Sequence, residues 1–118
     1  MYRQGDVAIF TADEYAAIFG SVPEKGTRVD RDKGRVVLAY GEVTGHAHAI
    51  AAPEAEMWTF VGTDDNGALG NDNDRLLVCL GEVALGHEEH STINLPAGDY
   101  VVKRQREYGP DELRTVAD

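Results

Sequence analysis

Residues 35 to 40 read Arg35-Val36-Val37-Leu38-Ala39-Tyr40, a short apolar run with two adjacent β-branched residues. Such a run is typical of a buried strand. Comparable runs on both sides, bounded by Gly, Pro, Asn and Asp, predict further strands at residues 7–10, 44–51, 56–61, 75–80 with an extension over 82–85, 93–95 and 100–108. Short strands separated by turn signals favour a mainly β fold, either a small β-barrel or a jelly-roll-like sandwich.

One or two short helices are expected beside the strands. Thr11 is suited to cap a helix over residues 12–19, and Gly20 is suited to end it. Pro110 fits the first turn of a second helix at 111–116. The polar, Gly-containing stretches at 21–34 and 63–74 are expected to be loops.

Composition limits the classes of protein that fit. The chain has 118 residues and 42% hydrophobic residues, which fits one globular domain over residues 1–118. There is no apolar run long enough to span a membrane and no signal-peptide core, so we expect a cytoplasmic protein. The only cysteine, Cys79, lies in an apolar run and is expected to be a buried, unreactive thiol.

The net charge of −10 argues against broad nucleic-acid binding. Lys103, Arg104 and Arg106 form a candidate local basic strip, but the favoured interpretation is that they are ordinary charges on an exposed strand.

The four histidines lie in two segments that echo each other. Both segments begin with Gly-Glu-Val, at 41–43 and 81–83. Each segment continues to a Gly-His pair that is followed by a second histidine. The pairs are His46 with His48, and His87 with His90. We hypothesise that the two segments are neighbouring strand ends.

This pattern indicates a metal site. Residues i and i+2 of a strand point to one face, so His46 and His48 would direct two imidazoles the same way. Imidazole is a good ligand for zinc, iron or nickel. Glu88 or Glu89 is a candidate carboxylate ligand, partner of an imidazole, or catalytic group. The competing interpretation is that the histidines are surface residues that satisfy local hydrogen bonds.

Four pieces of the chain together resemble a group of small, uncharacterised bacterial and phage proteins. They are residues 2–7, the stretch Gly41-Glu42-Val43-Thr44-Gly45-His46-Ala47-His48, the stretch His87-Glu88-Glu89-His90, and residues 104–108. The resemblance covers most of the chain but brings no assigned activity.

A looser resemblance is to cupins. The cupin pattern of Gly, His-x-His and Glu is similar to Gly41, His46, His48 and Glu54. The chain departs from the second cupin motif, Pro-x-Gly followed by histidine, because Pro96-Ala97-Gly98 is followed by Asp99 and the histidines come before it. The resemblance therefore implies a cupin-like fold and carries over only His46 and His48 as metal ligands.

Three functions follow as hypotheses. The first is a small domain that binds a divalent metal ion, with zinc the first choice and iron or nickel as alternatives, whether or not it catalyses a reaction on a small molecule. The second is a metal-free interaction or assembly module of a bacterial or phage system, with a protein partner or with self-association into a homo-oligomer through strand edges. The third is a small RNA-directed hydrolase that uses His and Glu as acid and base.

Overall fold

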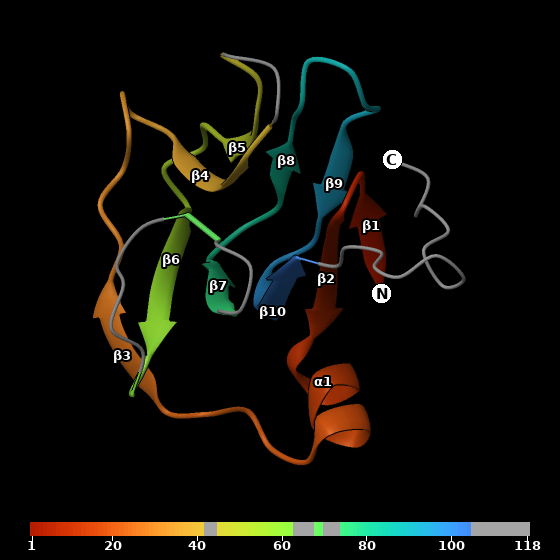
Figure 1. Ribbon diagram of the computed structural model, residues 1–118, viewed down its shortest axis with the longest axis vertical. Helices are drawn as coiled ribbons and strands as arrows, with labels where there is room; N and C mark the ends of the chain where they lie inside the picture. Colours follow the sequence, from red (N-terminus) through yellow and green to blue (C-terminus); the bar gives the residue numbers. More distant parts are fainter. Residues whose placement is uncertain (42–44, 63–67, 70–73, 105–118) are drawn as a thin grey trace, which may run out of the picture.

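A computed structural model of the chain describes residues 1–41, 45–62, 68–69 and 74–104 (Figure 1). These residues form β1 (Tyr2–Gln4), β2 (Val7–Thr11), α1 (Ala12–Phe19), β3 (Lys25–Arg28), β4 (Val36–Tyr40), β5 (Ala47–Ile50), β6 (Ala55–Phe60), β7 (Arg75–Cys79), β8 (Val83–Leu85), β9 (Ile93–Leu95) and β10 (Gly98–Arg104). The prediction of a mainly β protein is confirmed. Among the described residues, no helix is long and apolar enough to cross a membrane.

The strands form one large antiparallel sheet and two small ones. The large sheet has the order β1-β2-β10-β7-β6-β3, while β4 pairs with β5 and β8 pairs with β9. Because β1 and β3 are left as open edges, the described strands do not close into the barrel that was one of the two predicted architectures. Two backbone hydrogen bonds of 3.0 Å between Ala49 and Gly86 join the β4–β5 hairpin to the end of β8.

The main core lies between the large sheet and the two small ones. Alternate residues of a strand face opposite sides of a sheet. Accordingly, Val7 and Ile9 of β2 pack in the main core with Leu38, Ile50 and residues of β6, β7, β8, β9 and β10. Ala8 and Phe10 face the other side, where they pack with Tyr15 of α1.

Helix α1 covers this second face of the large sheet, at the foot of β2 (Figure 1). Its predicted bounds and caps are confirmed. The Thr11 hydroxyl accepts a hydrogen bond from the Glu14 amide, the Glu14 carboxylate accepts one from the Thr11 amide, and Gly20 ends the helix at φ 108°. Local capping interactions therefore set both ends of the helix.

Two strands lie where none was predicted. β3 lies within the expected loop at 21–34, because its polar sequence lacks the apolar alternation by which strands are recognised. Its pairing with β6 holds it at the sheet edge, and Gly26 permits the close approach, since a Cβ there would lie 2.9 Å from Thr59 Oγ1. β1 is similarly held by its pairing with β2.

The expected extension of the 75–80 strand over 82–85 is a separate strand, since β7 belongs to the large sheet and β8 pairs with β9. The second predicted helix at 111–116 and most of the 63–74 loop lie outside the described residues.

Candidate functional site

The structure brings both histidine pairs together. His48 lies in β5, His46 lies just before it, and His87 and His90 lie in the connection from β8 to β9. The Ala49–Gly86 hydrogen bonds set this connection beside β5. The two segments of the sequence echo are therefore spatial neighbours, although they are about forty positions apart in the chain.

His87 lies at the centre of the cluster. Its ring centroid is 4.4 Å from that of His48, 4.6 Å from that of His90 and 5.8 Å from that of His46. The rings of His48 and His90 are 5.9 Å apart and close to parallel. Four imidazoles thus occupy one small region, and His48 is the buried member at 2% exposure.

Gln4 orients His48. The Gln4 amide group donates hydrogen bonds of 3.0 Å to the carbonyl oxygens of Leu85 and Ser91, so its Oε1 must act as acceptor. Oε1 lies 2.8 Å from His48 Nδ1, which therefore carries the ring proton and donates. In the neutral ring, the lone pair of His48 is consequently on Nε2. A metal-binding histidine is held in the same way, through a donated hydrogen bond from its other nitrogen.

Asp6 faces His48 from the turn between β1 and β2. Its Oδ1 lies 3.7 Å from His48 Nε2, and its Oδ2 accepts a 2.8 Å hydrogen bond from Arg104 Nε. Burial alone would raise the pKa of Asp6, but the neighbouring His48 imidazole and the Arg104 guanidinium outweigh it and hold the pKa well below its usual range. Asp6 is therefore an ionised carboxylate at the edge of the cluster.

Glu88 and Glu89, the predicted carboxylates, have different partners. Glu88 accepts a 3.0 Å hydrogen bond from the Ala47 backbone amide, and this bond is the main reason that its pKa is lowered. Glu89 lies 3.0 Å from His46 Nδ1, while its backbone amide donates a 3.0 Å hydrogen bond to His87 Nδ1. Glu88 thus fixes the connection to the start of β5, and Glu89 contacts the imidazoles.

Two glycines make space for the rings. A Cβ on Gly5 would lie 2.9 Å from His90 Nε2 and 3.1 Å from His48 Cε1, and Gly5 also has a positive φ of 59°. A Cβ on Gly41 would lie 3.1 Å from the Cβ of His46. Larger residues at these positions would displace the imidazoles.

The neutral form of His87 is favoured. Burial lowers its pKa, and repulsion from His48 and His90 lowers it further. Because His87 Nδ1 accepts from the Glu89 amide, the neutral ring carries its proton on Nε2. As the side chains stand, the described residues include no group of three or more His, Cys, Asp or Glu side chains arranged to hold a metal ion.

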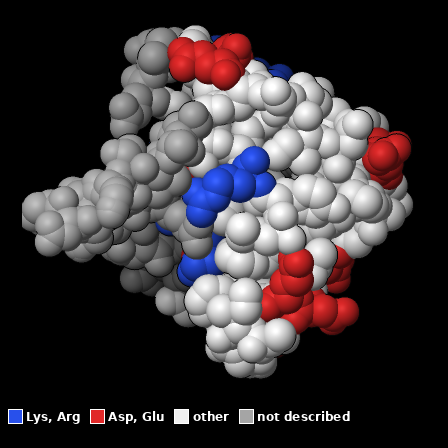
Figure 2. Space-filling model, turned by 90° about the vertical axis from the view of Figure 1, so that its right-hand side faces the viewer, with Lys and Arg blue, Asp and Glu red and all other residues white. Residues whose placement is uncertain are grey.

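The predicted basic strip is divided between two ion pairs. Lys103 binds Asp74 at 3.1 Å, and Arg104 binds Asp6 and the Tyr40 carbonyl oxygen, while Arg106 lies outside the described residues. Figure 2 shows basic side chains in a narrow band on one face, with acidic groups toward its rim. Arg104 thus supports the histidine cluster through Asp6.

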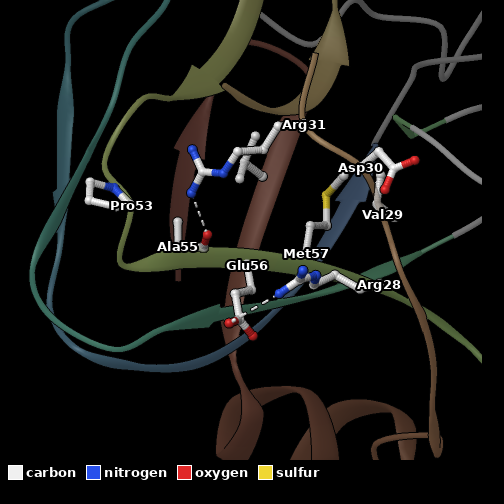
Figure 3. A pocket seen from close by; sticks show the side chains of 9 residues that line it. Arg28, Val29, Asp30, Arg31, Pro53, Ala55, Glu56 and Met57 are labelled. Carbon is white, nitrogen blue, oxygen red and sulfur yellow. Dashed lines mark hydrogen bonds and ion pairs between the residues drawn. The ribbon is translucent and has the colours of Figure 1, made fainter. Parts of the chain in front are cut away.

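A separate pocket of about 310 Å³ lies between β6 and the segment after β3 (Figure 3). Its guanidinium groups already have partners. Arg31 donates to the carbonyl oxygens of Gly34, Ala51, Ala52 and Ala55, and Arg28 lies 3.7 Å from Glu56. The pocket lining includes no histidine.

Glu54, the cupin-like candidate, packs beside Gly81, where a Cβ would lie 3.4 Å from its Cγ. Gln4 and Asp6 lie against His48, and Arg104 reaches the cluster through Asp6, but none of the three was predicted as a residue of the histidine site. The segments that carry them belong to the bacterial and phage resemblance, and Arg104 was otherwise singled out only in the candidate basic strip.

Fold and site together define a mainly β domain with a cluster of four histidines. The chain belongs to the family described as "Domain of unknown function (DUF8820)", whose model matches residues 3–105. That match includes all four histidines together with Gln4, Asp6 and Arg104. No curated protein and no solved structure matches the chain.

Proposed function

We propose that this domain binds a divalent metal ion through its clustered histidines. The single observation that carries the proposal is the convergence of the two histidine pairs on His87, with ring centroids 4.4, 4.6 and 5.8 Å away. Close packing of imidazoles is unfavourable when they are protonated and favourable around a shared cation. Zinc is the first choice because it accepts imidazole ligands in several geometries, with iron and nickel as alternatives.

Two features of the cluster support this chemistry. The Gln4 hydrogen bond leaves the lone pair of His48 on Nε2. The lowered pKa of His87 keeps that ring neutral, as a ligand must be.

Binding requires the side chains to adjust. His87 must take its other tautomer to ligate through Nε2 and thereby gives up the hydrogen bond from the Glu89 amide. The loss of one such bond costs about 0.5–1.5 kcal/mol. A structural zinc ion binds with about 10–16 kcal/mol in small peptides, so this cost is minor.

The test is elemental analysis of protein purified without an affinity tag, followed by titration with zinc, iron(II) and nickel. We expect near-stoichiometric metal in the wild-type protein. We expect its loss in the His87→Ala/His90→Ala and His46→Ala/His48→Ala variants. Glu82→Gln changes an exposed carboxylate at the start of β8 and serves as control. If no metal binds to the folded wild-type protein in any titration, the proposal is wrong.

A second candidate is a metal-free interaction module. It is favoured by the internal partners of the histidines, since His46 contacts Glu89, His48 contacts Gln4, and His87 accepts from the Glu89 amide. The open edges β1 and β3 would then be surfaces for self-association. In that case the histidine variants keep any oligomer that the wild-type protein forms. Action on RNA would instead appear as histidine-dependent turnover without added metal.

The finer predictions on fold and location also remain proposals. A jelly-roll-like or cupin-like sandwich is supported by the Ala49–Gly86 hydrogen bonds, which link β4, β5, β8 and β9 into one layer opposite the large sheet. A cytoplasmic location rests on the sequence alone, and cell fractionation tests it.

A further inference from the structure

Two electron-pair acceptors face each other at the buried side of the cluster. They are Nε2 of His48 and Oδ1 of Asp6, which lie 3.7 Å apart. The residues come from strands far apart in the sequence, since Asp6 precedes β2 and His48 lies in β5. Both side chains are largely buried, with 19% exposure for Asp6 and 3% for His48.

When the His48 ring is neutral, the hydrogen-bond network leaves an electron pair on each of these two atoms. Gln4 Oε1 accepts a hydrogen bond from His48 Nδ1, which leaves the lone pair of the neutral ring on Nε2. Arg104 Nε donates a 2.8 Å hydrogen bond to Oδ2 of Asp6. The other oxygen, Oδ1, faces the histidine cluster. A separation of 3.7 Å is too long for a hydrogen bond between the two atoms. Two such acceptors are stable at this range when a cation lies between them.

We propose that Asp6 is a ligand of the metal ion, so that the site combines imidazoles with one carboxylate. This inference rests on the proposed metal binding. Zinc lies about 2.0–2.2 Å from nitrogen and oxygen ligands. With an ion at those distances, the two atoms 3.7 Å apart would subtend an angle of about 120–135° at the ion, wider than the tetrahedral value of about 109°. A small movement of either side chain corrects it.

Arg104 is then a positioning residue. It binds one carboxylate oxygen of Asp6 and the Tyr40 carbonyl oxygen at 3.0 Å, which ties the ligand to β4 as well as to β10. Gln4 does the same for His48 from the opposite side. Gly5 lies between Gln4 and Asp6 in sequence and leaves room for His90. The β1–β2 turn, Gln4-Gly5-Asp6, thus supplies an orienting group, space and a ligand in three consecutive residues.

A carboxylate ligand has a consequence for metal choice. A site that includes a carboxylate oxygen suits manganese and iron(II) better than an all-imidazole site. Nickel and copper favour imidazole. Asp6→Asn should therefore weaken manganese binding more than nickel binding. A residue that merely supports the fold would weaken the binding of all metals together.

The experiment compares wild-type protein, Asp6→Asn and Asp74→Asn in titrations with zinc, manganese and nickel, together with cobalt(II) absorption spectra. Asp74 is the matched control, because it forms the same kind of ion pair with the neighbouring β10 residue Lys103. We expect Asp6→Asn to weaken zinc binding at least about 10-fold, to shift the cobalt spectrum, and to lose more affinity for manganese than for nickel. Asp74→Asn should behave as wild type.

The outcomes separate the two proposals. If the wild-type protein binds no metal, the proposed function itself is wrong. If it binds metal and Asp6→Asn retains the same affinity and the same cobalt spectrum, Asp6 is not a ligand and only the present inference is overturned. If Asp6→Asn does not fold, the carboxyl carbon resonance of Asp6 in the wild-type protein decides. It should move on addition of zinc while that of Asp74 stays fixed, and an unmoved Asp6 resonance overturns the inference.

Discussion

Gln4 Oε1 accepts a 2.8 Å hydrogen bond from His48 Nδ1, a contact that links β1 to β5 across 44 positions of the sequence. Gln4 is itself 2% exposed and donates to the carbonyl oxygens of Leu85 and Ser91. One amide group therefore joins β1, β5 and both ends of the segment that carries His87 and His90.

Gln4→Met tests this role, because methionine has a similar volume and cannot form the three hydrogen bonds. Leaving buried acceptors without a donor should lower the free energy of unfolding by about 1–3 kcal/mol. If the cluster binds metal, the loss of the partner of His48 should also weaken binding about 10–100-fold. Urea denaturation and zinc titration measure the two effects. Asn94→Ala, at an exposed position in β9, is the control, and equal behaviour of the two variants would contradict the assigned role.

Gly5→Ala should be destabilising for two separable reasons. The residue has a φ of 59°, and an added Cβ would lie 2.9 Å from His90 Nε2. Gly34 also has a positive φ, 82°, but an added Cβ there meets nothing within 4 Å. Gly34→Ala should therefore cost only the backbone penalty of about 1–2 kcal/mol.

Thermal or urea denaturation gives the free energy of unfolding of Gly5→Ala and of Gly34→Ala. The difference between the two values is due to the contact of the added Cβ with the histidines. We expect Gly5→Ala to be the less stable variant and also to shift the imidazole resonance of His90. Equal stability of the two variants would show that the His90 contact is relieved without cost.

Acid should destabilise the wild-type protein more steeply than Asp6→Asn. In the folded protein, the neighbouring His48 imidazole and the Arg104 guanidinium hold the pKa of Asp6 below its usual range against the effect of burial. A carboxylate with a lowered folded-state pKa stabilises the fold above its unfolded-state pKa of about 3.9 and loses that contribution as the pH falls toward the folded-state value.

Urea denaturation between pH 7 and pH 3 measures this effect. The difference in free energy of unfolding between the wild-type protein and Asp6→Asn should begin to shrink near pH 4 and continue to shrink down to the lowest pH measured. A constant difference across the whole range would mean that the charge of Asp6 does not stabilise the fold.

Thr11→Ala should destabilise α1, because it removes the hydroxyl that accepts from the Glu14 amide and one half of the capping box. The expected loss is about 0.5–2 kcal/mol in the free energy of unfolding. Ser21→Ala, at an exposed position after the helix, should have little effect. Denaturation followed by far-UV circular dichroism compares the two variants, and equal midpoints would contradict the importance of the cap.

Cys79 should resist thiol reagents in the folded protein. Its side chain is buried in the main core at 3% exposure, and burial together with the charge of Asp99 raises its pKa to about 11. The thiolate, which is the reactive form, is therefore scarce at pH 8. A colorimetric disulfide reagent should label the protein only after urea is added, whereas rapid labelling of the folded protein would contradict the burial of Cys79.

The local elements were predictable because short-range chemistry sets them. Thr11, Glu14 and Gly20 fix the ends of α1 within ten residues of sequence, and apolar runs such as that in β4 mark buried strands. β3 was missed because its residues are polar and it is a strand only by virtue of pairing with β6. β7 and β8 were merged because sequence periodicity does not show when the chain passes from one sheet to another.

The sequence by itself singled out all four histidines, through the echo of Gly-Glu-Val and Gly-His. Only the tertiary structure decided that these histidines meet, and that Gln4, Asp6 and Arg104 are their neighbours. The physical reason is the length scale. Periodicity and caps act over a few residues, whereas the contact between Asp6 and Arg104 spans 98 positions and exists only because β2 pairs with β10.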